Sequence, residues 1–191
     1  PCRRARPGPP GGSPATGPGG RGGPTKGDRV ATYGKNSDAY LIAFLACARA
    51  GLVHVPINFA LTGDELQHFF DDSGASLVMV DPSLMPHIET VNSPEAVLLR
   101  DGERSLLDAA RSPEPPPTLD VDVSDTDLAQ LLYTSGTTSR PKGAMMTHRA
   151  LVHEYVSSIT ALDFTADDDP LHVMPLYHSA QMHVFIMPQL M

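Results

Sequence analysis

Between residues 29 and 110, short continuous apolar runs alternate with longer segments that carry helix signals. The runs at 29–33, 52–57 and 77–80 are rich in apolar and β-branched residues, which is typical of strands covered on both faces. A shorter apolar run at 97–99 predicts one more strand. Because strands and helices alternate, the pattern predicts an α/β fold of layered, parallel-rich sheets with flanking helices.

Polar residues mark the ends of the expected helices. Residues 36–38 offer N-caps for a helix that ends just before Gly51. Thr62 and Glu65 have the spacing of a capping box, so a second helix is expected to open there and to stop at Gly74. Both glycines suit the left-handed backbone conformation that commonly closes a helix.

The second half of the chain follows a connector rich in Pro and Asp at 112–127. An apolar run at 128–134 predicts a strand, and 144–147 is expected to return beside it as a hairpin partner. A helix is predicted over 149–160 and a further strand over 171–174. No internal repeat is found.

Composition narrows the class of protein. The 191 residues are 41% hydrophobic and 19% charged, as in a globular domain or a large part of one. No apolar run reaches the ~18 residues that a membrane span needs. Cys2 and Cys47 are too few for a disulfide framework, and Cys47 lies in an apolar run as a buried small side chain would. A cytoplasmic location is therefore expected.

Residues 1–27 differ from the remainder. They hold seven Pro, nine Gly and five basic side chains without one acid, so we expect a disordered head. They lack the apolar residues of a targeting peptide. The remaining nine basic and 22 acidic side chains give residues 28–191 a net charge of −13, which argues against a nucleic-acid partner.

Candidate chemistry concentrates in the polar strip YTSGTTSRPKG, residues 133–143. Backbone N–H groups and hydroxyls in a Gly/Ser/Thr loop after a strand can bind phosphate oxygens. Lys142 adds a compact positive charge for a terminal phosphate. Gly136 and Gly143 permit tight turns, and Pro141 stiffens the approach to the lysine.

Two other interpretations of this strip compete with that one. A Walker A loop that starts at Gly136 requires Gly and Ser/Thr where Pro141 and Gly143 stand, which argues against it. Composition alone also fits a hydroxyl-rich surface hairpin.

The longer stretch YTSGTTSRPKGAMMTHRAL resembles the phosphate-loop signature of the adenylate-forming superfamily, which includes acyl-CoA synthetases, peptide-synthetase adenylation domains and luciferases. Two more stretches are similar to the same family. GDRVATYGKNSDAYLIAFLACARAGLVHVPIN resembles its early strand–helix–strand segment, and MPLYHSAQMH its segment after the phosphate loop. The likeness covers residues 27–191 and implies that 28–191 form an incomplete N-terminal AMP-binding domain.

The resemblance also implies a reaction. ATP with Mg²⁺ activates a small-molecule carboxylic acid, most readily a fatty acid, to an acyl-adenylate, and coenzyme A then displaces AMP. The residues that correspond to the family's β/γ-phosphate site are Thr134, Ser135, Gly136, Thr137, Thr138 and Lys142. Lys142 and His178 are the implied catalytic residues, with His178 near the acyl or adenylate pocket; it could equally be an ordinary helix-start histidine. No protein metal site is expected.

Some features depart from the family pattern. Ser139 stands where Gly is usual, which strains the loop if that position needs φ > 0, or else adds a phosphate donor. Family segments that hold adenine, ribose and the C-terminal catalytic lysine are not found. We therefore expect an N-terminal piece of a longer enzyme that does not turn over alone. Two alternatives to an acyl-CoA synthetase stay open: an adenylation domain for an amino or aryl acid, and a non-catalytic nucleotide-binding remnant.

Overall fold

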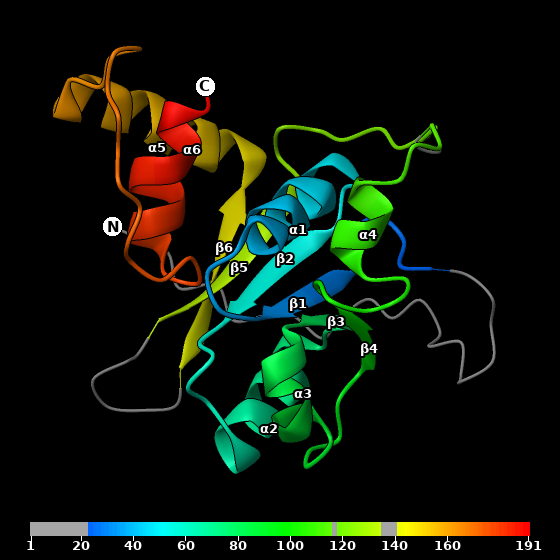
Figure 1. Ribbon diagram of the computed structural model, residues 1–191. Coiled ribbons are helices and arrows are strands. Elements are labelled where there is room, and N and C mark those ends of the chain that lie inside the picture. Colours follow the sequence, from blue (N-terminus) through cyan, green and yellow to red (C-terminus); the bar gives the residue numbers. More distant parts are fainter. Residues whose placement is uncertain (1–22, 116–117, 135–140) are drawn as a thin grey trace.

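The computed structural model describes residues 23–115, 118–134 and 141–191, and its central element is a six-stranded sheet (Figure 1). The strand order is β4-β3-β1-β2-β5-β6. All neighbouring strands are parallel except β5 and β6, which form an antiparallel pair at one edge. The predicted α/β class with a parallel-rich sheet is confirmed. Of the expected disordered head, residues 1–22 lie outside the described part of the chain.

The strands are β1 Arg29–Tyr33, β2 Val53–Ile57, β3 Leu77–Val80, β4 Glu95–Leu98, β5 Leu128–Thr134 and β6 Lys142–Thr147. The helices are α1 Asp38–Arg49, α2 Gly63–Ser73, α3 Met85–Ile88, α4 Leu106–Ala110, α5 His148–Leu162 and α6 Met187–Gln189, with a 3₁₀ turn η1 Pro82–Leu84 and a π-helix η2 Ala180–Ile186. Among the described residues, no helix is long and apolar enough to cross a membrane.

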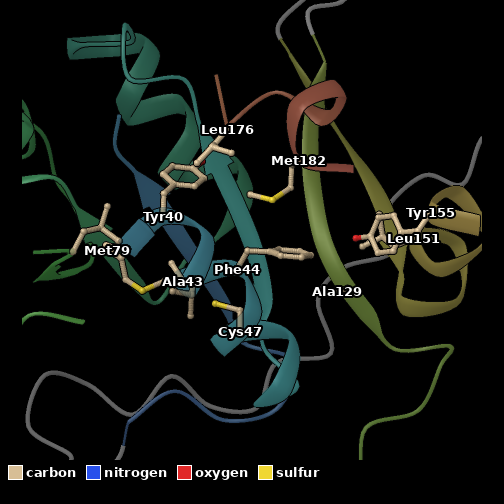
Figure 2. Packing of buried hydrophobic residues seen from close by; sticks show 13 residues of the cluster. Tyr40, Ala43, Phe44, Cys47, Met79, Ala129, Leu151, Tyr155, Leu176 and Met182 are labelled. Carbon is tan, nitrogen blue, oxygen red and sulfur yellow. The ribbon is translucent and has the colours of Figure 1, made fainter. Parts of the chain in front are cut away.

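Helices cover both faces of the sheet, and the strand residues alternate between two cores. In β1, Val30 packs into the core under α1, whereas Ala31 and Tyr33 pack into the core under α2 and α3. This period of two explains why the central strands are apolar on both faces. In Figure 2 the ring of Phe44 extends from α1 toward β5. Cys47 is 2% exposed and unpaired, in agreement with its interpretation as a buried small side chain.

The helix ends follow the sequence signals with one exception. Gly51 and Gly74 have φ values of 67° and 59°, as expected of residues that close helices. Thr62 is the N-cap of α2, but its side chain accepts no capping hydrogen bond, so the predicted capping box is wrong. On α1 it is Ser37 that caps, through a hydrogen bond from the Tyr40 N–H.

The strand predicted over 171–174 is also wrong. Those residues form no strand, and Leu171 and Val173 are 86% and 72% exposed. The backbone groups of Met174 bond to side chains instead of to a neighbouring strand: its N–H donates to Gln181 Oε1 and its carbonyl accepts from Asn36 Nδ2. An apolar run forms a strand only where the edge of a sheet provides partners for its backbone hydrogen bonds.

Candidate functional site

A cavity of about 460 Å³ opens where β2 and β5 end. Its walls come from segments far apart in the sequence: Pro56, Asn58, Leu61, Phe69, Leu132, Tyr133, Thr134, Pro141, Tyr177, His178 and Ser179. Ligands of open α/β sheets bind at the carboxyl ends of the parallel strands, because that edge collects loops and unpaired backbone groups. The cavity therefore lies where a ligand site is expected.

The β5–β6 hairpin brings both ends of the polar strip to this cavity. Thr134 and Lys142 form the last residue pair of the hairpin before its loop, and Lys142 is exposed. The predicted phosphate-site residues Ser135, Gly136, Thr137 and Thr138, and also Ser139, lie outside the described residues. The described residues on either side of them, Thr134 and Pro141, both line the cavity.

Gly143 is required by packing in the hairpin. A Cβ atom placed on it would lie 2.7 Å from Cδ1 and 2.9 Å from Cγ of Leu131. Real Cβ contacts do not approach so closely, so a larger residue would require the side chain of Leu131 to move. Gly143 pairs with Tyr133 in the hairpin, next to the pair of Lys142 and Thr134.

Tyr133 is held from two sides, so the start of the polar strip is fixed. Its hydroxyl donates to Oδ2 of Asp72 on α2 at 2.6 Å, and its ring lies 4.3 Å from that of Phe69. Burial, and then the Asp72 carboxylate, raise the pKa of Tyr133 well above its usual range. The phenol stays protonated at neutral pH and remains a donor.

His178 lies in the turn before η2 and lines the same cavity as Thr134. Its Nδ1 accepts a hydrogen bond from the Ala180 N–H at 3.3 Å. With Nδ1 as the acceptor of this bond, a ring proton is on Nε2. The histidine can therefore offer one N–H donor to a ligand. The structure brings His178 and Thr134 together; their roles stay predictions.

Asn36 clamps the turn that carries His178. Its Nδ2 donates to the Met174 carbonyl, and its Oδ1 accepts from the Leu176 N–H, each at 2.8 Å. From the local pattern, Asn36 is expected only as a possible helix cap. Its partners are 138 and 140 residues away, and no local pattern marks such a pair.

Replacement of Asn36 by alanine should loosen this turn selectively. Two hydrogen bonds of about 1 kcal/mol each are lost, so amide exchange at Leu176 should become about tenfold faster or more, with the central strands unaffected. Hydrogen–deuterium exchange by mass spectrometry on a peptide that covers 172–178 measures this. Lys35→Ala, an exposed neighbour in the same loop, is the control. Equal exchange in all three proteins would contradict the clamp.

The described residues offer little for a metal. They contain no group of three or more His, Cys, Asp or Glu side chains arranged to hold an ion. The described lining of the cavity has no carboxylate, which is the side chain that Mg²⁺ usually takes from a protein. We therefore assign no residue of the described chain to Mg²⁺. The same lining would not repel an anionic ligand.

The structure is that of an α/β protein in which a mostly parallel sheet ends in an antiparallel edge pair, with a cavity at the carboxyl ends of β2 and β5. The family model for AMP-binding enzymes matches residues 21–191. The chain belongs to the AMP-binding enzyme family, which confirms the resemblance of the polar strip to the adenylate-forming signature.

Named relatives of the chain include acid–CoA ligases. It is 42% identical over 165 residues to a feruloyl-CoA synthase from an Amycolatopsis species, covering 86% of the chain and 32% of that protein. It is 34% identical over 169 residues to the long-chain-fatty-acid–CoA ligase FadD13 of Mycobacterium tuberculosis, covering 84% and 33%.

A solved structure shows the same likeness. The crystal structure of ATP-bound MatB from Rhodopseudomonas palustris superposes with a TM-score of 0.72 at 37% identity, covering 85% of this chain and 33% of that one. The chain spans about a third of the length of these relatives.

Proposed function

We propose that this chain supplies the phosphate-binding part of an ATP-dependent acid–CoA ligase. In the first step a carboxylate oxygen of the acid attacks the α-phosphorus of ATP, and pyrophosphate leaves with the electron pair of the broken P–O bond. In the second step the sulfur of coenzyme A attacks the acyl carbon, loses its proton to the medium, and AMP leaves. The observation that carries the proposal is the hairpin register, which pairs Lys142 with Thr134, a residue of the cavity wall.

The loop residues are proposed to stabilise charge on the leaving pyrophosphate. The Thr134 hydroxyl and the Lys142 ammonium would act with the hydroxyls and amides of Ser135, Gly136, Thr137 and Thr138. Fixed donors directed at developing charge lower a barrier without reorganisation, and loss of one such donor typically slows a reaction 10²- to 10³-fold. Mg²⁺ would arrive with the phosphates of ATP, and no step above depends on a protein ligand for it.

His178 is proposed to touch the acid or its adenylate. Its Nδ1 is occupied by the Ala180 N–H, so the proton on Nε2 is the one available to a ligand oxygen. A neutral donor in this position can orient the carboxylate without a salt bridge that would weaken its nucleophilicity. The histidine would then position the acid, and Lys142 would act at the other end of the reaction.

Two classes of acid fit the apolar and aromatic walls of the cavity. A fatty acid is favoured by the resemblance of residues 174–183 to fatty-acyl-CoA synthetases, and one relative is named a long-chain-fatty-acid–CoA ligase. An aryl acid is favoured by the higher identity to the feruloyl-CoA synthase. The ring of Tyr177 lies in the cavity wall, edge-on to Phe59 at 5.5 Å, and such a surface can pack against either an aromatic ring or an alkyl chain.

Acid-dependent exchange of labelled pyrophosphate into ATP tests the first step. In a protein of the relatives' full length that contains this chain, we expect exchange that needs an added acid, with ferulate and octanoate as the paired probes, and release of AMP only when coenzyme A is also present; the 191 residues alone are expected to show no exchange. ATP binding without exchange by any acid would favour a non-catalytic nucleotide-binding protein. Exchange with an amino acid alone would favour an adenylation domain of the peptide-synthetase type.

A further inference from the structure

A continuous chain of hydrogen bonds crosses the core on the α1 face of the sheet. His54 Nε2 lies 3.0 Å from Thr32 Oγ1, and His54 Nδ1 lies 3.0 Å from Gln130 Nε2. Gln130 Oε1 lies 2.7 Å from His183 Nε2, and His183 Nδ1 lies 3.0 Å from the Tyr155 hydroxyl. Thr32, His54, Gln130 and His183 are all at most 1% exposed.

The amide of Gln130 determines the direction of every bond in this chain. Its NH₂ must donate to His54 Nδ1, so the proton of His54 is on Nε2 and points to Thr32. Its oxygen must accept from His183 Nε2–H, so His183 Nδ1 accepts from the Tyr155 hydroxyl. Both imidazoles are neutral with the proton on Nε2, and no donor or acceptor of the two rings is left unpaired.

Gln130 reaches this face because β5 is irregular there. The register with β6 shifts between Leu128 and Gln130, as in a β-bulge. Ala129 belongs to the core on the α1 face, and the next residue, Gln130, bonds on that same face although regular strands alternate. The bulge therefore turns the side chain of Gln130 toward η2, four residues before Thr134 at the end of the strand.

The Gln130–His183 hydrogen bond joins two elements that each contain or adjoin a residue of the cavity wall, Thr134 on β5 and His178 before η2. β5 continues from Gln130 to Thr134, where the phosphate loop begins. η2 carries His183 in a π-helix and starts two residues after His178. π-helical turns are rare and recur at functional sites because they displace the residues around them. One buried hydrogen bond thus joins the strand before the loop to the segment after His178.

We propose that Gln130 is a positioning residue which, through His183, sets the place of His178 relative to Thr134 at the end of β5. This proposal rests on the proposed function for its catalytic consequence, but the position itself is a property of the chain without ligands. An apolar side chain would fill the same volume. Only an amide, however, pairs with both rings and selects one arrangement of η2 against the sheet.

The test compares Gln130→Met with Leu66→Ala, a large-to-small change in the opposite core that is expected to destabilise the fold without contacting this chain of bonds. In the unmodified protein, ¹⁵N NMR of the histidine rings should show Nε2–H tautomers for His54, His183 and His178. In Gln130→Met the His178 signal should become a mixture of tautomers, and exchange of the Ala180 amide should become about tenfold faster. Leu66→Ala should change neither.

Two more variants keep the test decisive. His183→Phe retains the aromatic packing on Phe44 and Tyr155 but breaks the bond to Gln130, so it should reproduce the effect on His178 if Gln130→Met folds poorly. Tyr155→Phe keeps the Gln130–His183 bond and should leave His178 unchanged. The proposal is overturned if His178 and the Ala180 amide are unaffected in His183→Phe and Gln130→Met, or respond equally in Leu66→Ala.

Kinetics separate this proposal from the proposed function. If pyrophosphate exchange is observed, Gln130→Met should lower its kcat about tenfold with the KM for ATP unchanged, because the phosphate loop itself is intact. A rise in KM for ATP with kcat unchanged would contradict the proposal. If a protein of the relatives' full length that contains this chain shows no exchange, the proposed function fails, whereas the NMR result on the chain itself still decides whether Gln130 positions His178.

Discussion

Lys142→Met should weaken ATP binding about 100-fold while the fold remains intact. A hydrogen bond to a charged group contributes about 1.5–3 kcal/mol, and the upper part of this range corresponds to that loss of affinity. Lys142 is exposed, so its replacement should change the free energy of unfolding by less than about 0.5 kcal/mol. Isothermal titration calorimetry with ATP, and urea unfolding of the same samples, measure the two quantities.

Two control variants accompany Lys142→Met: one keeps the positive charge at position 142, and the other removes a positive charge elsewhere. Lys142→Arg retains the charge and should recover most of the affinity, because a phosphate accepts either cation. Arg49→Met removes an exposed charge from the last turn of α1, at the opposite end of the sheet, and should bind ATP as the unmodified protein does. Equal weakening in Lys142→Met and Arg49→Met would mean that general electrostatics, and not the loop, binds the nucleotide.

Mild acid should destabilise the protein strongly through two buried histidines. Burial, and then the neighbouring His183, lower the pKa of His54 to about 3, and burial lowers the pKa of His183 to about 4. In the unfolded chain both pKa values return to about 6.5. The stability that these neutral rings contribute is complete above pH ~6.5 and is lost as the pH falls toward the folded-state values. From pH 7.5 to 5 we expect a loss of about 4 kcal/mol, roughly 2 per ring.

Urea unfolding at a series of pH values measures this effect as a slope. The slope of the unfolding free energy against pH gives the number of protons taken up on unfolding. Between pH 5 and 6 this number should be smaller by about one in His183→Gln, whatever the stability of the variant at neutral pH. His153→Gln, an exposed position on α5, should keep the full slope. A free energy of unfolding that does not change between pH 7.5 and 5 would contradict the neutral, buried arrangement of His54 and His183.

The sequence predicted the elements whose signals are local. The strand at 29–33 and the hairpin that begins at 128 could be recognised because apolar runs, glycines and turn residues stand next to one another in the chain. The segment 171–174 shows the limit of this reasoning, since apolar residues alone do not say whether a sheet edge is available. Thr62 shows it again, because a capping sequence does not guarantee the hydrogen bond.

Part of the candidate site was predictable for a different reason. Thr134, Lys142 and His178 belong to long, ordered motifs, and the structure places Thr134 and His178 on one cavity. Asn36 and Gln130 were not predictable as site residues, since Asn36 binds a turn 138 residues away and Gln130 binds His183 53 residues away. The donor and acceptor pairing that gives them a role exists only after the sheet has formed.

The most direct test of the account is whether the loop between β5 and β6 binds polyphosphate. The measurement is NMR of the chain with labelled backbone amides and lysine ammonium groups, titrated with ATP and separately with inorganic pyrophosphate. The account predicts that the amides of residues 134–138 and the Lys142 Nζ respond to both ligands, and that AMP affects them much less. Binding of ATP that leaves these signals unchanged, or no binding at all, would contradict it.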